Sequence, residues 1–221
     1  MNAFDILSHV DHTLLSPTAT WDEIKTLAEE AVAFRTASVC VPPAYVARLR
    51  GAFGDSLPIC TVIGFPLGYD AAAVKIAAAQ EAVAEGADEI DAVINRADLK
   101  NGDFANVTHE IAALKDAIGP RVLKIIVEAC DLTREEKIAA CRCVTEGGAD
   151  FIKTSTGFGK GGATHEDIDL FRAHIGPGVR MKAAGGIRTV EDMKAYLAQG
   201  CDRIGASAAV RLLRERLDEE I

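Results

Sequence analysis

Three lysines occupy equivalent places in the chain, each as the third residue of a short apolar run. They are Lys124 in VLKII, Lys153 in FIK and Lys182 in RMKAA, and 29 residues separate each from the next. Asp91 ends the similar run EID. A buried lysine is costly unless it is paired, and three lysines near one acid exceed simple pairing. The pattern therefore indicates chemistry on an amine.

Crowded lysines suggest imine chemistry. A free lysine has a pKa of about 10.4, but burial and a neighbouring ammonium group both disfavour its charged form. A neutral amine can attack a carbonyl and form a Schiff base. We expect Lys182 to perturb Lys153 in this way and Asp91 to shuttle protons. The structural alternative is a salt-bridged polar plug in which Asp91 and Glu128 offset the lysines.

The elements that must position these side chains are short apolar strands separated by helical patterns. Continuous apolar runs, rather than alternating ones, are typical of parallel strands covered on both faces. Eight strand and helix units in this length predict a (β/α)8 barrel, here one domain over residues 1–221. A doubly wound open sheet is the alternative, but no Rossmann-type glycine fingerprint follows an early strand. The expected strands are 9–15, 38–41, 58–64, 89–95, 122–128, 151–155, 180–186 and 202–207.

Helix start signals lie between these strands. Thr20 with Glu23, and Thr133 with Glu136, fit the capping box, in which side chains satisfy the first free backbone N–H groups. Thr164 is a further N-cap candidate, as is Thr189. Glycines stand where the helices should stop: Gly86, Gly119, Gly147, Gly148, Gly176 and Gly200.

The strand entries GADEID, GADFIK and GCDRIG repeat a common pattern and differ at the last place, which holds Asp91, Lys153 and Gly205. Side chains alternate between the two faces of a strand. Charges do not belong against the surrounding helices, so Asp91 and the three lysines should point into the barrel. Barrel active sites lie at the C-terminal mouth, where we expect this group.

The last two strand ends carry a phosphate signal. AAGGIRT contains Gly185 and Gly186, and IGAS contains Gly205 and Ser207. Glycines let backbone N–H groups approach an anion, and helices that begin near Thr189 and Ser207 would direct positive dipole ends at it. Barrels frequently bind phosphate at these two loops.

Composition excludes other classes. The net charge of −9 disfavours duplex binding, and no apolar run approaches the ~20 residues that span a bilayer. The N-terminus lacks the basic cluster of a secretory signal. The six cysteines are scattered without zinc spacing. We therefore expect reduced thiols, no metal or cofactor, no nucleic acid or membrane partner, and a cytoplasmic location.

Together, DHTLL, EIDAVIN, LKIIVE, FIKTSTGFGKGGAT, KAAGGIRT and RIGAS resemble the 2-deoxy-D-ribose-5-phosphate aldolase family from about Val10 to Ser207. The resemblance implies a metal-free cytoplasmic class I aldolase on a (β/α)8 barrel, acting in deoxyribose phosphate catabolism and homo-oligomeric as a dimer or tetramer. It implies that Lys153 is the Schiff-base lysine and that Asp91 and Lys182 transfer protons. It also implies substrate-binding roles for Asp11, Thr13, Lys124, Thr156, Gly157, Gly185, Gly186, Gly205 and Ser207.

The chain departs from some family members at two places. Phe158 stands directly after TSTG, where some members carry a phosphate-binding lysine, and Lys160 follows two residues later. Some members end in a tyrosine that assists proton transfer, whereas this chain ends in LDEEI. We therefore expect backbone groups to hold the phosphate, and water with Asp91 and Lys182 to move the protons.

Two other function classes share the loop pattern. A phosphate-binding barrel isomerase would form no covalent imine, and a transaldolase would carry a three-carbon unit in place of acetaldehyde. A non-catalytic phosphosugar-binding protein would bind without turnover. The trio Asp91, Lys153 and Lys182 argues against this last class.

Overall fold

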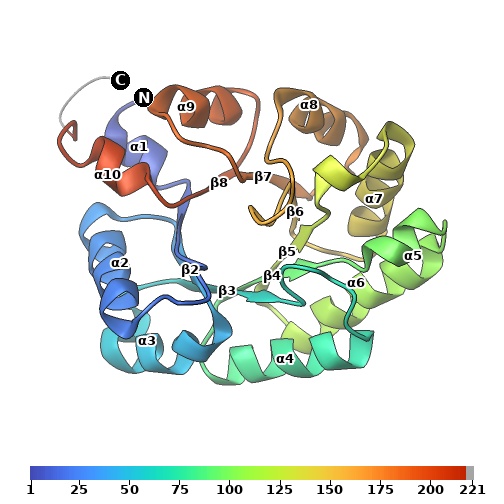
Figure 1. The fold of residues 1–221 in the computed structure, drawn as a ribbon, viewed down its shortest axis with the longest axis horizontal. Coiled ribbons are helices and arrows are strands. Elements are labelled where there is room, and N and C mark those ends of the chain that lie inside the picture. The colour runs from blue at the N-terminus through green and yellow to red at the C-terminus, as the bar shows by residue number, and fades with distance from the viewer. Residues whose placement is uncertain (218–221) are drawn as a thin grey trace.

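The computed structural model describes residues 1–217, so the last four residues of the LDEEI end lie outside the described residues. Eight parallel strands follow one another in chain order and close into a barrel (Figure 1). The barrel prediction is confirmed, and the open sheet is wrong because β1 pairs with β8. The strands are β1 (Val10–Thr13), β2 (Ser38–Val41), β3 (Ile59–Ile63), β4 (Glu89–Val93), β5 (Val122–Ile126), β6 (Phe151–Lys153), β7 (Arg180–Ala184) and β8 (Arg203–Ala206).

Helices surround the barrel as an outer ring (Figure 1). Within residues 1–217, none of them has the length and apolar content needed to cross a membrane. The helices are α1 (Ala3–Leu7), α2 (Trp21–Phe34), α3 (Val46–Phe53), α4 (Ala72–Ala84), α5 (Arg96–Lys100), α6 (Phe104–Ile118), α7 (Arg134–Glu146), α8 (His165–His174), α9 (Val190–Ala198) and α10 (Ala209–Leu213).

The predicted helix starts are confirmed. Thr20 and Thr133 both form capping boxes, with Glu23 and Glu136 as the reciprocal partners. Thr164 caps α8 and Thr189 caps α9. These side chains satisfy backbone N–H groups that a helix leaves free at its start, so each fixes the residue at which its helix begins.

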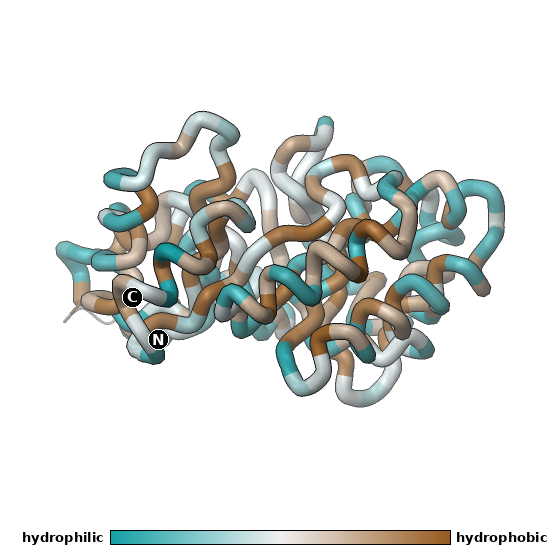
Figure 2. Tube along the Cα trace, turned by 90° about the horizontal axis from the view of Figure 1, so that it is seen from below, coloured by the Kyte–Doolittle hydropathy of each residue, from teal (hydrophilic) through white to brown (hydrophobic). Residues whose placement is uncertain are grey.

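The hydrophobic core lies between the barrel and the helices. Figure 2 shows hydrophobic stretches running through the molecule, with hydrophilic residues gathered at the outer turns. On β5, Leu123 and Ile125 are buried in this core, whereas Lys124 between them points to the other face. The alternation on this strand therefore places apolar side chains against the helices and the charged side chain toward the barrel axis.

Candidate active site

The strand register brings the predicted residues together in pairs. Asp91 on β4 lies beside Lys124 on β5, and Lys153 on β6 lies beside Lys182 on β7. Lys124 itself pairs with Phe151, two residues before Lys153. The three lysines are therefore not level, because barrel strands are staggered: Lys124 lies deeper and Lys153 lies nearer the mouth.

Asp91 is the centre of the charged group. Its Oδ2 lies 2.7 Å from Nζ of Lys153 and 2.7 Å from Nζ of Lys182, and its Oδ1 lies 2.8 Å from Nζ of Lys124. The thiol of Cys60 also donates to Oδ1, at 3.1 Å. Asp91, Lys124 and Lys182 are fully buried, whereas Lys153 keeps 3% of its surface exposed.

Two further carboxylates complete the group from below. Asp11 pairs with Lys182 and with Arg203, and accepts a hydrogen bond from Ser38 at 2.8 Å. Glu89 lies 2.6 Å from Lys124 and 2.7 Å from Arg203. We call these seven ion-paired side chains the charge network: Asp11, Glu89, Asp91, Lys124, Lys153, Lys182 and Arg203.

The network fixes the protonation of its buried members. Burial alone would raise the pKa of Asp91, but Lys124, Lys153 and Lys182 outweigh it and hold that pKa well below its usual range. Burial alone would lower the pKa of Lys182, but Asp11 and Asp91 outweigh it and raise that pKa. Asp91 is therefore a carboxylate and Lys182 an ammonium ion at neutral pH.

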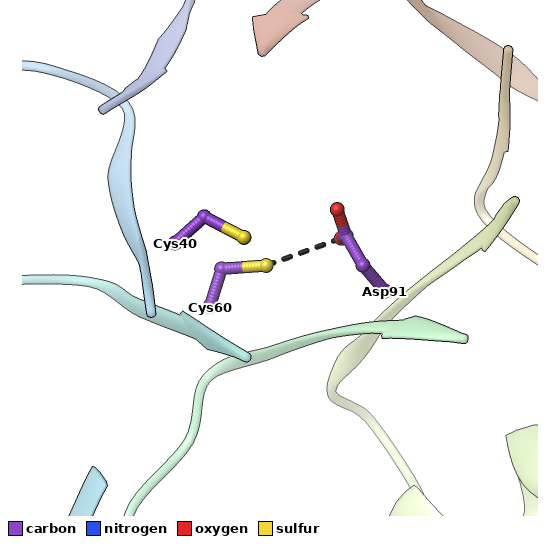
Figure 3. A group of neighbouring side chains, drawn as sticks. All are labelled: Cys40, Cys60 and Asp91. Carbon is purple, nitrogen blue, oxygen red and sulfur yellow. Dashed lines mark hydrogen bonds between the residues drawn. The ribbon is translucent and has the colours of Figure 1, made fainter. Parts of the chain in front are cut away.

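Cys40 on β2 and Cys60 on β3 face Asp91 on β4 (Figure 3), and their sulfur atoms and a carboxylate oxygen lie within 4.8 Å of one another. These donor types could ligate a soft metal ion. However, the ammonium group of Lys124 already lies 3.2 Å from Cys60 Sγ and 2.8 Å from Asp91 Oδ1. A cation is thus supplied by the chain itself, so the residues do not fit a metal site. All six cysteines are free thiols, as expected.

A cavity of about 290 Å³ opens at the barrel mouth above the charge network. Lys153 reaches it, while Asp11, Asp91, Lys124 and Lys182 are fully buried and do not line it. The amine of Lys153 is therefore the group through which the network meets a ligand. The other predicted residues on the cavity wall are Thr13, Thr156, Gly157, Gly185, Gly186, Gly205 and Ser207.

One side of the cavity is built from backbone. Gly185 and Gly186 have φ angles of +82° and +77°, which side-chain-bearing residues rarely adopt. The loop at Gly162 packs against them so closely that a Cβ there would lie 2.2 Å from the carbonyl oxygen of Gly185. Thr189 starts α9 immediately after this turn. At this helix start the N–H groups of Arg188 and Thr189 donate to the carboxylate of Asp192, and the N–H of Asp192 donates to the hydroxyl of Thr189.

Arg188 is the cation on the cavity wall that the sequence reasoning missed, although it lies in the quoted GGIRT motif. Lys160, by contrast, is 73% exposed and its amine lies 3.2 Å from Asp131. It is not among the lining residues, and Phe158 takes a place on the wall instead. Glu89 and Arg203 were also missed. Period-two alternation identifies both, since each lies two residues before a predicted residue, Asp91 or Gly205.

Contrary to the polar-plug alternative, Glu128 does not offset the positive charges of the three lysines. Its backbone is left-handed, with φ of +51°, and its buried carboxylate accepts hydrogen bonds from the backbone N–H and hydroxyl of Thr156. It therefore holds the loop that forms the cavity wall. The acids that pair with the lysines are Asp11, Glu89 and Asp91.

Lys75 is a further buried lysine, and its surroundings differ from those of Lys153. Its amine lies 3.0 Å from both carboxylate oxygens of Glu110 and donates to the carbonyl of Val93 at 2.9 Å. This group links α4, α6 and the end of β4, and it lies outside the cavity wall. Lys153, in contrast, pairs with one carboxylate oxygen and faces the cavity.

Known proteins are similar to this chain in sequence and in fold. The chain is 57% identical to the deoxyribose-phosphate aldolase of Clostridium botulinum over 214 residues, which cover 97% of each chain. It is 50% identical to that of Streptococcus agalactiae over 220 residues, covering 100% of this chain and 99% of the relative. The tetrameric deoxyribose phosphate aldolase of Aeropyrum pernix superposes with a TM-score of 0.87 at 32% identity, covering 96% and 91% of the chains. Residues 6–214 match the DeoC/LacD family of aldolases, and the chain belongs to this family.

Proposed function

We propose that the protein is a class I aldolase that reversibly cleaves 2-deoxy-D-ribose 5-phosphate to D-glyceraldehyde 3-phosphate and acetaldehyde. The observation that carries this proposal is the amine of Lys153, which lies at the cavity wall with a buried carboxylate 2.7 Å behind it. An amine in this position can react with an aldehyde and return its proton to the network. The reaction places the protein in deoxyribose phosphate catabolism.

The reaction begins when the neutral amine of Lys153 attacks the C1 aldehyde. Loss of water gives an iminium ion, which withdraws electrons from the C2–C3 bond. The C3 hydroxyl then loses its proton, the C2–C3 bond breaks, and glyceraldehyde 3-phosphate leaves. The electron pair remains as an enamine of acetaldehyde on Lys153. Protonation of the enamine at C2 and hydrolysis of the iminium ion release acetaldehyde and restore the amine.

Asp91 and Lys182 support these proton transfers. Asp91 contacts the amine of Lys153 directly, so it can accept a proton from that nitrogen. Lys182 remains charged and donates to the same carboxylate oxygen. Because both are buried, water in the cavity carries protons between this pair and the substrate hydroxyl. Thr13 and Thr156 also line the cavity. Their hydroxyl groups already donate to the carbonyl of Asp11 and to Glu128, so each offers the sugar an acceptor oxygen.

The imine is the first test of this proposal. Acetaldehyde followed by borohydride should add one ethyl group to the protein, and peptide mapping should place it on Lys153. Reduction fixes the iminium carbon to the nitrogen as a stable secondary amine. An isomerase or a non-catalytic binding protein would remain unlabelled. A label on Lys124 or Lys182 with Lys153 unmodified would contradict the assignment.

The phosphate should lie against Gly185, Gly186, Gly205 and Ser207, with Arg188 beside it. We expect Arg188→Ala to lower kcat/KM for the phosphorylated sugar by roughly tenfold, in line with a charge-assisted contact of about 1.5 kcal/mol. Lys160→Ala is the matched control, since its amine is exposed and pairs with Asp131. Lys160→Ala should lower kcat/KM for the phosphorylated sugar by less than about threefold.

The measurement is the ratio of kcat/KM for deoxyribose 5-phosphate to that for deoxyribose. A collapse of this ratio in Lys160→Ala, with no change in Arg188→Ala, would reverse the assignment of the cation. We further propose a homo-oligomer, as a dimer or tetramer, and a cytoplasmic location, on the basis of family membership. Light scattering of the purified protein measures its oligomeric state.

A further inference from the structure

Glu89 and Arg203 lie at the starts of β4 and β8, at the closed end of the barrel. The guanidinium group of Arg203 forms a bidentate ion pair with the carboxylate of Glu89, with N–O distances of 2.7 Å and 3.1 Å. Its centre also lies 5.9 Å from the ring of Phe151, which places it inside the barrel. Neither residue lines the cavity, so neither touches a substrate.

Both residues nevertheless contact the charge network that ends at Lys153. Arg203 donates to Asp11, which also pairs with Lys182. Glu89 lies 2.6 Å from Lys124, which also pairs with Asp91. Two routes of ion pairs therefore run from the closed end of the barrel to the carboxylate that holds the amine of Lys153.

The network contains four bases and three acids, so it carries one surplus positive charge when all four bases are protonated and all three acids are ionised. Lys153 is the base that can release it at least cost, because its amine pairs with Asp91 alone among the network acids and reaches the cavity. Lys124 pairs with three acids, and Lys182 and Arg203 with two each. Deprotonation of Lys153 neutralises the surplus and provides the nucleophile.

We propose that Glu89 and Arg203 are positioning residues for the aldolase reaction, which set through Asp11, Lys124 and Asp91 how readily Lys153 loses its proton. This rests on the proposed function, since it takes Lys153 as the nucleophile. Arg203 adds a positive charge to a largely buried network and favours the neutral amine. Glu89 adds a negative charge and opposes this, so the two residues act in opposite directions.

Other ionisable groups around Lys153 stay constant in this comparison. Lys182 and Lys124 approach from β7 and β5, Asp11 from β1, and the thiols of Cys40 and Cys60 from β2 and β3. Glu128 is held by Thr156 above the network. If a thiol of Cys40 or Cys60 lost its proton in place of Lys153, the thiolate would cancel the surplus positive charge instead. The shifts in the acid limb of kcat/KM that Glu89 and Arg203 variants cause would then vanish in a Cys40→Ser/Cys60→Ser background.

The test is the pH dependence of kcat/KM, whose acid limb reports the essential base of the free enzyme. Arg203→Met removes a positive charge, so the acid limb should move to higher pH by about one unit. Glu89→Gln removes a negative charge, so the limb should move to lower pH by a similar amount. Each variant leaves the remaining partner paired, Glu89 with Lys124 or Arg203 with Asp11.

Two controls separate this electrostatic role from packing. The double variant Glu89→Gln/Arg203→Met restores the parent charge, so its acid limb should return to the parent position although both contacts are lost. Arg203→Lys keeps the charge and should leave the limb in place. A purely structural role would lower kcat/KM in every variant with no opposed shift, and this outcome would overturn the proposal.

Borohydride trapping with acetaldehyde is run first on each variant. A parent protein that forms no imine at Lys153 refutes the proposed function itself. A parent that forms the imine, with acid limbs that do not move in opposite directions, refutes only the role of Glu89 and Arg203. Should Arg203→Met fail to fold, the comparison between Glu89→Gln and the double variant carries the test, since the limb must move back between them.

Discussion

Replacing Lys153 by arginine is expected to reduce turnover by about 10⁴-fold or more, the scale of loss seen when a covalent nucleophile is removed. The guanidinium group keeps the positive charge of a protonated lysine and can still pair with Asp91. It stays protonated and cannot form an imine. The measurements are kcat for cleavage of deoxyribose 5-phosphate and the mass of the protein after borohydride reduction with acetaldehyde.

Lys160→Arg is the matched control, because it makes the same change at an exposed lysine. It should retain the parent rate and the parent label. Circular dichroism of Lys153→Arg should show an intact fold, because the guanidinium group can replace the ammonium group in the ion pair with Asp91. Cleavage within tenfold of the parent rate in a folded Lys153→Arg protein would show that another amine is the nucleophile.

The barrel was accessible from sequence because its signals are local. A continuous apolar strand followed by a helix recurs eight times, and Thr20 and Thr133 mark helix starts by side-chain chemistry alone. The interior position of Lys124, Lys153 and Lys182 follows from the same local pattern, since a charge between two apolar residues on a strand must face away from the helices.

The levels of the lysines could not be read from sequence. Equal spacing of 29 residues suggests equal depth, yet Lys124 lies beside Phe151 and not beside Lys153. The stagger of neighbouring strands is set by closure of the whole barrel, which no single segment encodes. Which carboxylates pair with the lysines depends on that stagger. For this reason Glu89 escaped notice, although it shares a strand and a face with Asp91.

The loops posed a different difficulty. Lys160 carries a charge close to TSTG in sequence, but the loop turns its amine toward Asp131. Arg188 follows the glycine turn and reaches the cavity wall. Loop conformation is decided by contacts such as those of Glu128 with Thr156, between residues far apart in the chain. Motif residues were therefore predicted, while the choice between two nearby cations required the structure.

Asp91→Asn should lower kcat by about a hundredfold or more, because the amide cannot accept the proton that Lys153 must release. It keeps the shape of the side chain but removes a carboxylate that contacts Lys124, Lys153 and Lys182 together. With that negative charge gone, the ammonium form of Lys153 is less favoured. The acid limb of kcat/KM should then move to lower pH while the maximal rate falls.

This combination distinguishes a proton carrier from a structural support. Loss of a buried ion-pair partner also destabilises the fold, by about 3–5 kcal/mol, so rates must be measured well below the unfolding temperature of the variant. Ser38→Ala is a control, since it removes a neutral contact to Asp11 and leaves Asp91 in place. It should change kcat less than about tenfold. Parent-like kcat in folded Asp91→Asn would show that another group accepts the proton, with Asp91 serving only to hold the lysines together.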